Sequence, residues 1–358
     1  MDKEQLFLRF EEFMSSIKES ERVAVVHHRD ADGLCSAVVF SKALARLSGR
    51  AAASVISSEY SDLDEVIAAL KEIKPDRIAV LDLSIDQGKQ RVLELEKIAP
   101  LLILDHHKLY NDCNSERTVF IKSQMVSELD GSKYPASKLV FDLCSRLTDL
   151  SEERWIACVG LLGDMGYNTW KEFVDSTAKE TGVSLGELNA LKSLISAVET
   201  VKPREFSMLF AEFHSKKPAQ ILKSPLNKYK RELLKELTKW RKDFKENAEF
   251  FPEAELYFYV FKPRIELKSA LIDSLTFEFP DKTIVIVLDT GKGMLRFSAR
   301  RQDFKVKMNA LLEEAVKGIA GADAGGHIPA AAGSLPRNKL NVFKENVIRI
   351  LKRENRKR

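Results

Sequence analysis

The sequence predicts an α/β protein in which a parallel-sheet domain is followed by a smaller α/β domain, with a long helical linker between them. In the first half of the chain, short apolar runs rich in Val, Ile and Leu alternate with amphipathic helical patterns. Such alternation is typical of βαβ units around a parallel sheet. The alternation resumes near residue 255 after a basic helical stretch, and 358 residues are enough for two or three domains.

The first domain is expected to contain several strands and the helices that connect them. An amphipathic helix over residues 1–20 opens the chain. The strands are predicted at residues 23–28, 51–57, 77–83, 101–106 and 119–121. The helices that separate or follow them are predicted at residues 34–47, 62–71, 87–98, 136–148, 151–162 and 185–198.

The linker is strongly basic. Between residues 216 and 245 the chain carries eleven Lys or Arg residues against three acids. From residue 226 onward apolar side chains recur every three or four residues, which predicts one amphipathic helix with a basic outer face. Such a face is either an ordinary solvated surface or a surface that follows a nucleic-acid backbone, and both interpretations stay open.

The second domain is predicted from strand patterns at residues 256–261, 283–288 and 293–299 and from helical patterns at residues 268–277 and 305–318. In its third strand, Arg296, Ser298 and Arg300 alternate and therefore share one face. Two guanidiniums and a hydroxyl would form a phosphate clamp, although a half-exposed strand with ordinary polar residues gives the same pattern.

A loop rich in Gly and Ala is predicted at residues 322–333, around Gly325, Gly326 and His327. Small residues leave backbone N–H groups exposed and leave room for a bulky anionic ligand. The loop is therefore a second candidate anion-binding element.

The composition is that of a globular protein, with 44% hydrophobic residues, 31% charged residues and a net charge of +4. No apolar run approaches the roughly 20 residues of a membrane span, and the N-terminus lacks a signal-peptide core. We therefore expect no membrane association and a cytoplasmic location. The four cysteines form no CxxC pair, which argues against a disulfide framework or a zinc site.

Acids and histidines gather where the predicted strands end. In an open parallel sheet, the carboxyl ends of the strands form the ligand-binding edge, so these side chains are expected to converge. A lone Asp at such a place is usually a helix cap or a turn residue, but several acids together repel each other unless a cation holds them. The set that we interpret as a metal site consists of the strand-end residues His28, Asp30, Asp32, Asp82, Asp105, His106 and His107, together with Asp164, which follows a predicted apolar helix.

The adjacent histidines leave one choice in this set. Either His27 or His28 can be the ligand at the end of the first strand. We favour His28, because His28, Asp30 and Asp32 occupy alternate positions, and alternate residues of an extended segment point to the same side.

Five motifs, in order, resemble those of the DHH phosphoesterases that carry a DHHA1 C-terminal domain. They are HRDADG at 28–33, the acid of LDLS at 81–84, DHH at 105–107, GD at 163–164 and GGHIPAAAG at 325–333. This sequence departs from the family pattern in two places: Ala324 stands where many relatives have a third glycine, and the last motif contains an additional alanine.

The resemblance covers nearly the whole chain and implies its organisation. Residues 1–202 would form the DHH catalytic, metal-binding domain and residues 203–254 the basic helical linker. Residues 255–351 would form the DHHA1 substrate-binding domain and residues 352–358 a basic tail. The active site is implied to lie in the cleft between the two domains.

The resemblance also implies two divalent metal ions, and the mixture of imidazole and carboxylate ligands favours Mn²⁺ over Mg²⁺. One ion would be held by His28, Asp30 and Asp82. The other would be held by Asp32, Asp82, His106 and Asp164, with Asp82 bridging the two ions.

Further roles follow from the same resemblance. Asp82 and His107 would be catalytic, with His107 at the scissile phosphate, and Asp105 would orient neighbouring groups. Substrate phosphate would be held by a set drawn from the two candidate anion-binding elements, namely Arg296, Ser298, Arg300, Gly325, Gly326 and His327.

Within the family, the chain is most similar to archaeal RecJ-like single-strand nucleases. This similarity and the basic linker favour an exonuclease that releases nucleotides from single-stranded DNA or RNA. Two alternatives stay open. One is a phosphodiesterase or phosphatase for short oligoribonucleotides, cyclic dinucleotides or 3′-phosphoadenosine phosphate, and the other is an inactive replication-complex scaffold. A role in DNA repair, a helicase or replisome partner and a homo-oligomeric state also stay open.

Overall fold

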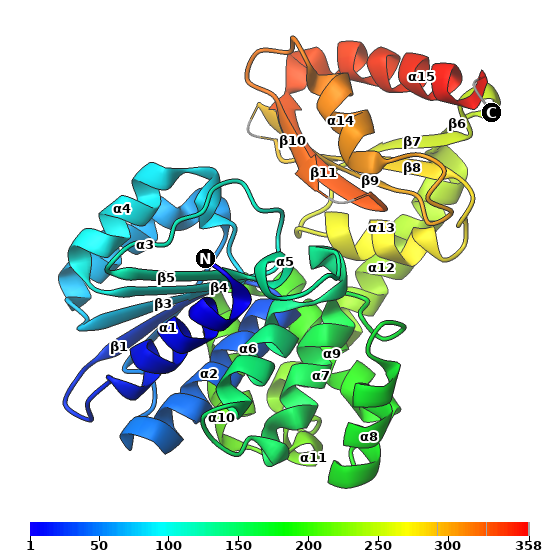
Figure 1. The fold of residues 1–358 in the computed structure, drawn as a ribbon. Coiled ribbons are helices and arrows are strands. Elements are labelled where there is room, and N and C mark those ends of the chain that lie inside the picture. The colour runs from blue at the N-terminus through cyan, green and yellow to red at the C-terminus, as the bar shows by residue number, and fades with distance from the viewer. Residues whose placement is uncertain (292, 327, 357–358) are drawn as a thin grey trace. The chain divides into compact units, whose positions relative to one another are not determined.

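The computed structural model describes residues 1–291, 293–326 and 328–356. The chain divides into two units, Met1–Lys230 and Arg231–Arg358 (Figure 1). Each unit contains its own sheet, so each is described by itself.

The first unit is built on a five-stranded sheet with the strand order β2-β1-β3-β4-β5, in which all neighbours are parallel. Every residue of β4 and β5 is buried, as expected for a parallel sheet covered on both faces. The predicted parallel sheet is therefore confirmed. Its strands are β1 (Val23–His28), β2 (Ser54–Ser58), β3 (Arg77–Leu81), β4 (Leu101–Asp105) and β5 (Thr118–Lys122).

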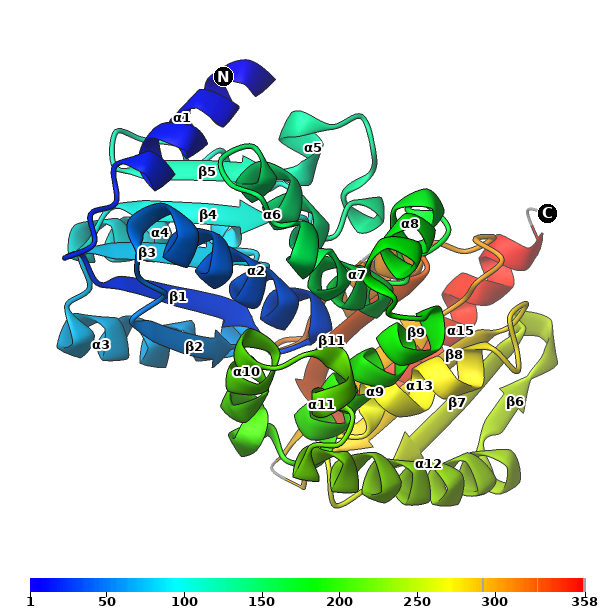
Figure 2. The ribbon, with the colours of Figure 1, turned by 90° about the horizontal axis from the view of Figure 1, so that it is seen from below.

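Helices lie on both faces of this sheet (Figures 1 and 2). On one face, α3 (Leu63–Ile73) and α4 (Lys89–Ile98) pack through Leu70 and Leu95 into a core with Val80 of β3. The other face is covered by α1 (Lys3–Ser15), α2 (Ala31–Ser48) and α6 (Ala136–Ser145). The remaining helices of this unit are α5 (Ser123–Val126), α7 (Arg154–Gly163), α8 (Lys171–Thr181), α9 (Leu185–Val201), α10 (Phe206–Ser215) and α11 (Pro218–Ile221).

Helix α12 (Lys228–Asn247) begins at the end of the first unit and continues into the second. It is amphipathic, as predicted. Leu233 and Phe244 are buried, whereas its exposed side includes a row of basic residues, Arg231, Lys235, Lys239 and Lys242.

The second unit is built on a six-stranded sheet with the order β10-β11-β9-β8-β7-β6, in which only β7 and β8 run parallel among the described strands. Leu295, Phe297 and Ala299 of β9 lie in one core with Leu311 of α14 and Phe343 of α15. Helix α13 packs against β8 and β9. The elements are β6 (Glu249–Phe251), β7 (Leu256–Phe261), α13 (Lys268–Thr276), β8 (Thr283–Asp289), β9 (Met294–Arg300), α14 (Met308–Val316), β10 (Asp323–Gly326), β11 (Ala330–Pro336) and α15 (Leu340–Arg356).

The segment rich in Gly and Ala is not the loop that the sequence predicted. Its two ends form strands β10 and β11, which pair antiparallel, and β11 pairs with β9. Small side chains permit this packing, because a Cβ atom on Gly333 would lie 2.5 Å from the ring of Phe297. His327, part of the same prediction, lies outside the described residues.

Part of the predicted basic tail, residues 352–356, is helical in the structure. They continue α15 to Arg356, and the helix is anchored by the buried side chains of Phe343, Val347 and Leu351. The four cysteines are free thiols. None of the helices in the described ranges is both long and apolar enough to traverse a bilayer.

Candidate metal centre

The candidate ligands of the first unit converge at the carboxyl ends of β1, β3 and β4. Strand β1 ends at His28, and Asp30 then caps helix α2 by accepting the backbone N–H of Gly33 at 2.9 Å. A Cβ atom on Gly33 would lie 2.4 Å from the carbonyl oxygen of His28, so only glycine fits this turn. The turn brings the imidazole of His28 to the carboxylate of Asp30, with 2.7 Å between Nδ1 and Oδ2.

Asp82 lies at the centre of the cluster. It follows β3 in a left-handed backbone conformation, with φ of 60°, and its N–H donates to the carbonyl of Leu104. Its side chain is 1% exposed, and neither carboxylate oxygen has a hydrogen-bond partner among the described residues. A buried carboxylate in this state is unfavourable unless a cation or another partner satisfies it.

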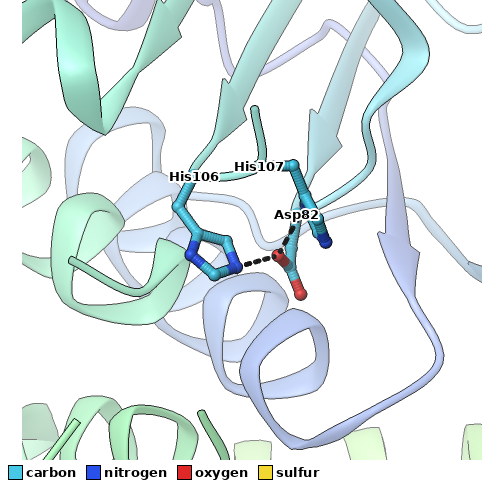
Figure 3. A group of neighbouring side chains, drawn as sticks. All are labelled: Asp82, His106 and His107. Atoms are coloured by element: carbon cyan, nitrogen blue, oxygen red, sulfur yellow. Dashed lines mark ion pairs between the residues drawn. The ribbon is translucent and has the colours of Figure 1, made fainter. Parts of the chain in front are cut away.

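Asp82 lies in ion-pair contact with both histidines of the DHH sequence (Figure 3). His106 Nε2 is 3.3 Å from Asp82 Oδ1, and His107 Nδ1 is 3.8 Å from the same oxygen. His106 Nε2 also lies 3.1 Å from Asp164 Oδ2 and 3.9 Å from Asp32 Oδ2. Ligands predicted from four separate parts of the sequence thus meet around His106 and Asp82.

Three overlapping groups in this cluster have the geometry to hold a metal ion, with the ligand atoms of each group within 4.8 Å of one another. They are His28 with Asp30 and Asp82, Asp82 with His106 and His107, and Asp32 with His106 and Asp164. The donor atoms are imidazole nitrogens and carboxylate oxygens, a set that suits Mn²⁺ or Mg²⁺.

The electrostatics of the cluster fit a bound cation. Burial raises the pKa of Asp32 well above its ordinary value, and the neighbouring carboxylates of Asp82 and Asp164 raise it further. A divalent ion would offset both effects, because it supplies the opposite charge to these buried, mutually repelling carboxylates. The residues present therefore fit the metal ions that the sequence implied.

Two ligands are oriented by groups that the sequence analysis missed. The carboxylate of Asp32 accepts the backbone N–H groups of Ala136 and Ser137 at 2.6 and 3.0 Å, and also accepts the Ser137 hydroxyl. The ring of His106 is held by its Nδ1 atom, 3.0 Å from the carbonyl oxygen of Gly131, so that Nε2 points to the cluster. Such contacts fix the direction and protonation of metal ligands.

Asp105 supports His107 and is itself held by a buried lysine. Its Oδ1 atom lies 2.7 Å from His107 Nδ1 and accepts the backbone N–H groups of His106 and His107. Lys122 of β5 is fully buried, with Nζ 2.9 Å from Asp105 Oδ2 and 2.8 Å from Asp86 Oδ1. Although burial alone would raise the pKa of Asp105, His107 and Lys122 hold it well below its usual range.

The two adjacent histidines, His27 and His28, have different environments in the structure. His27 is buried, its Nδ1 lies 2.7 Å from the carbonyl oxygen of His28, and burial lowers its pKa to about 4. His28 belongs to one of the three ligand groups found among the described residues, whereas His27 belongs to none of them.

In the second unit, the candidate anion-binding residues of β9 share one face, as predicted. Arg296 is exposed and Ser298 is buried, while Leu295, Phe297 and Ala299 face the core. Arg296 lies 3.2 Å from Glu266, and Arg300 lies 3.1 Å from Asp273.

The glycines of β10 point to opposite faces of the sheet. Gly325 pairs with Ala332 of β11, and Ala332 pairs with Ser298 of β9. Gly325 therefore lies on the same face of the sheet as the cations of β9. Gly326 has φ of 139°, and a Cβ atom there would lie 2.6 Å from the carbonyl oxygen of Ala330. Gly326 is therefore required for backbone geometry, whereas Gly325 leaves open space.

Both units match known protein families. Residues 22–162 match the DHH family, N-terminal domain, and residues 264–353 match the DHHA1 domain. This chain is a DHH-family protein with a DHHA1 domain. The resemblance inferred from the motifs is therefore confirmed for both domains. Among curated proteins, none matches the chain.

Solved structures show the same fold at low sequence identity. RecJ from Thermus thermophilus in complex with Mn²⁺ has a TM-score of 0.72 at 17% identity, over 98% of this chain and 54% of that one. Exonuclease RecJ bound to manganese has a TM-score of 0.63 at 16% identity, over 99% of this chain and 95% of that one. CDC45 from Entamoeba histolytica has a TM-score of 0.55 at 10% identity, over 98% of this chain and 99% of that one. The DHH protein thus spans about half the length of the Thermus RecJ.

Proposed function

We propose that this DHH protein is a two-metal-dependent phosphodiesterase that releases nucleotides from the end of single-stranded DNA or RNA. The observation that carries the proposal is the position of Asp82. Its buried carboxylate belongs to two of the three ligand groups and makes no hydrogen bond among the described residues. A carboxylate with two ligand sets around it is suited to bridge two cations.

We assign the ligands to two ions in the way that the motifs implied. His28, Asp30 and Asp82 would hold one ion, and the other would be held by Asp32, Asp82, His106 and Asp164. When bound, such ions activate water and neutralise the negative charge of the attacked phosphate. Mn²⁺ is our first choice because two of the assigned ligands, His28 and His106, are histidines.

His107 is assigned to the scissile phosphate. Its side chain is 33% exposed, so a substrate can reach it, whereas Asp105 is fully buried behind it. The ionised carboxylate of Asp105 lies 2.7 Å from Nδ1 and favours a proton on that atom. His107 is thereby held in one orientation, in which it can contact phosphate oxygen and supply a proton to the leaving oxygen.

The polymeric substrate is supported by charge and by the similarity in fold to the RecJ exonucleases. The exposed side of α12 carries the basic row Arg231, Lys235, Lys239 and Lys242. In the second unit, Arg296 and Arg300 share a face with Ser298. Phosphate contacts of this kind add affinity along a strand.

The test is hydrolysis of end-labelled single-stranded DNA and RNA of several lengths, with Mn²⁺, with Mg²⁺ and with EDTA. The control is the Asp82→Asn variant. We expect stepwise loss of nucleotides from one end of long strands, dependent on metal and abolished in the variant. Turnover confined to strands of two to four nucleotides would instead indicate a small-substrate phosphodiesterase. Metal binding without turnover would indicate the scaffold function.

A further inference from the structure

Lys268 lies on the anion-binding face of the second unit, although no sequence motif includes it. It is the first residue of α13. Its ammonium donates to the hydroxyl of Ser298 at 2.8 Å and approaches the carbonyl oxygen of Phe297 at 3.4 Å. Lys268 therefore stands beside Ser298, on the same face of β9 as Arg296 and Arg300.

The position is electrostatically unfavourable for a cation. Arg296 and Arg300 each have a carboxylate within 3.2 Å, but the hydrogen bonds described for Lys268 go to neutral oxygens. Lys268 also lies at the N-terminus of a helix, where the helix dipole disfavours positive charge. A lysine that served only for packing would reach solvent with its ammonium and avoid these penalties.

Both carboxylates and guanidinium groups surround the ammonium of Lys268. Burial lowers its pKa to about 8; Glu266 and Asp273 oppose this effect, and Arg300 and Arg296 add to it. Strand β8 faces the same side with the apolar residues Ile284, Ile286 and Leu288. The ammonium is therefore only partly compensated, and an added anion would stabilise its charged form.

The neighbouring strands leave room for such an anion. Ser298 is level with Ala332 and Arg300 is level with Ala330, so methyl groups lie next to these two residues, whereas Arg296 is level with Ser334, whose hydroxyl donates to Asp323. Gly325 lies beyond Ala332 in the same row, and a Cβ atom there would have no neighbour within 4 Å. Lys268 and Arg300 thus border a floor of Gly and Ala, and Arg296 lies at its edge beside Ser334.

We propose that Lys268 is a phosphate-binding residue of the DHHA1 domain, which with Ser298 holds a backbone phosphate of the single-stranded substrate. This inference rests on the proposed function, because it takes the anion to be part of a nucleic-acid strand. Phosphate binding requires the protonated amine. Affinity is therefore full at pH values below the pKa of Lys268 in the free protein and declines as pH rises through about 8.

The experiment measures binding without hydrolysis. A 12-nucleotide oligo(dT) strand labelled with tetramethylrhodamine is titrated with protein in EDTA, from pH 6.5 to 9.5, and its anisotropy gives the dissociation constant. The proteins are the wild type, Lys268→Met, Lys268→Arg and the control Lys262→Met, which removes an exposed lysine of the same unit.

We expect Lys268→Met to weaken binding about tenfold at pH 7, as for one charge-assisted contact, and to abolish the decline above pH 8. Lys268→Arg should retain affinity and also abolish the decline, because a guanidinium stays protonated. The control should match the wild type. Binding by Lys268→Met within twofold of the wild type would overturn the proposal, as would a Lys268→Arg profile that still declines above pH 8.

The Lys268→Arg profile decides the question even if Lys268→Met fails to fold. Failure of the proposed function gives a different result. Wild-type protein that binds the strand with the expected pH dependence but hydrolyses nothing in Mn²⁺ would refute the exonuclease and leave the role of Lys268 intact. Wild-type protein that hydrolyses the strand with no contribution from Lys268 would refute this inference alone.

Discussion

Replacing Lys122 with methionine should destabilise the first unit strongly. Lys122, Asp86 and Asp105 all have fully buried side chains, and the ammonium lies within 2.9 Å of both carboxylates. Methionine is similar in length, so the main change is the loss of the charge. An uncompensated buried ion costs about 3–5 kcal/mol. We expect the lower end, about 3 kcal/mol, because both carboxylates keep backbone N–H donors such as those of Tyr110 and His106.

The measurement is equilibrium unfolding in urea and by heat, followed by circular dichroism. For a unit of this size, each kcal/mol shifts the midpoint by roughly 2–4 °C, so the transition should fall by roughly 6–12 °C. The double variant Lys122→Met/Asp86→Asn removes one of the two unpaired charges. It should recover about 1 kcal/mol or more of the loss.

Exposed Lys71 of α3 provides the matched control, because Lys71→Met removes the same charge from the surface. It should change stability by less than about 0.5 kcal/mol. The reasoning would be refuted if Lys122→Met cost less than about 1 kcal/mol or if the double variant were no more stable than the single one. Either result would mean that the three buried charges do not depend on one another.

Three further perturbations test the metal centre and the second sheet. Added Mn²⁺ at about 100 times its dissociation constant should stabilise the wild type by about 2.7 kcal/mol in a thermal-shift assay. The Asp82→Asn variant should lose most of this gain. It should keep its fold, because Asn tolerates the left-handed backbone conformation at this position. Ser137→Ala should weaken Mn²⁺ binding about 10-fold to 100-fold by calorimetry, because Asp32 loses its hydroxyl donor; unchanged affinity would refute that role. Gly326→Ala should destabilise the second unit by about 1–3 kcal/mol in urea unfolding, whereas Gly325→Ala should be nearly neutral, and equal losses would contradict the difference in geometry.

The strand-end ligands could be predicted because each lies directly beside a strongly apolar strand. An apolar run such as the one before Asp82 predicts a strand. Because ligands bind at the carboxyl ends of parallel strands, the residue that follows the run is expected at the ligand-binding edge of the sheet. Asp164 is different, because it follows helix α7, so the rule for parallel strands does not place it at the edge of the sheet. The choice of His28 over His27 depended on side-chain parity, and the geometry of the cluster agrees with it.

The supporting residues could not be predicted in the same way. Lys122 and Ser137 belong to no motif, and a lysine after an apolar strand is usually exposed. Their roles arise from contacts between residues far apart in the chain, such as the bond from Ser137 to Asp32. Strands β10 and β11 were missed for a related reason: Gly and Ala have low β-propensity, so pairing with β9, and not local sequence, makes them strands.

The ligands differ in how much of the chain must exist before they can assemble. The ligands of the group of His28, Asp30 and Asp82 lie within the first 82 residues, at the ends of the adjacent strands β1 and β3, and β4 supplies the Leu104 carbonyl that holds the backbone of Asp82. The group that contains Asp32 and His106 is completed by Asp164, after α7. During synthesis on the ribosome, the first group can therefore form while the last ligand of the second is still untranslated.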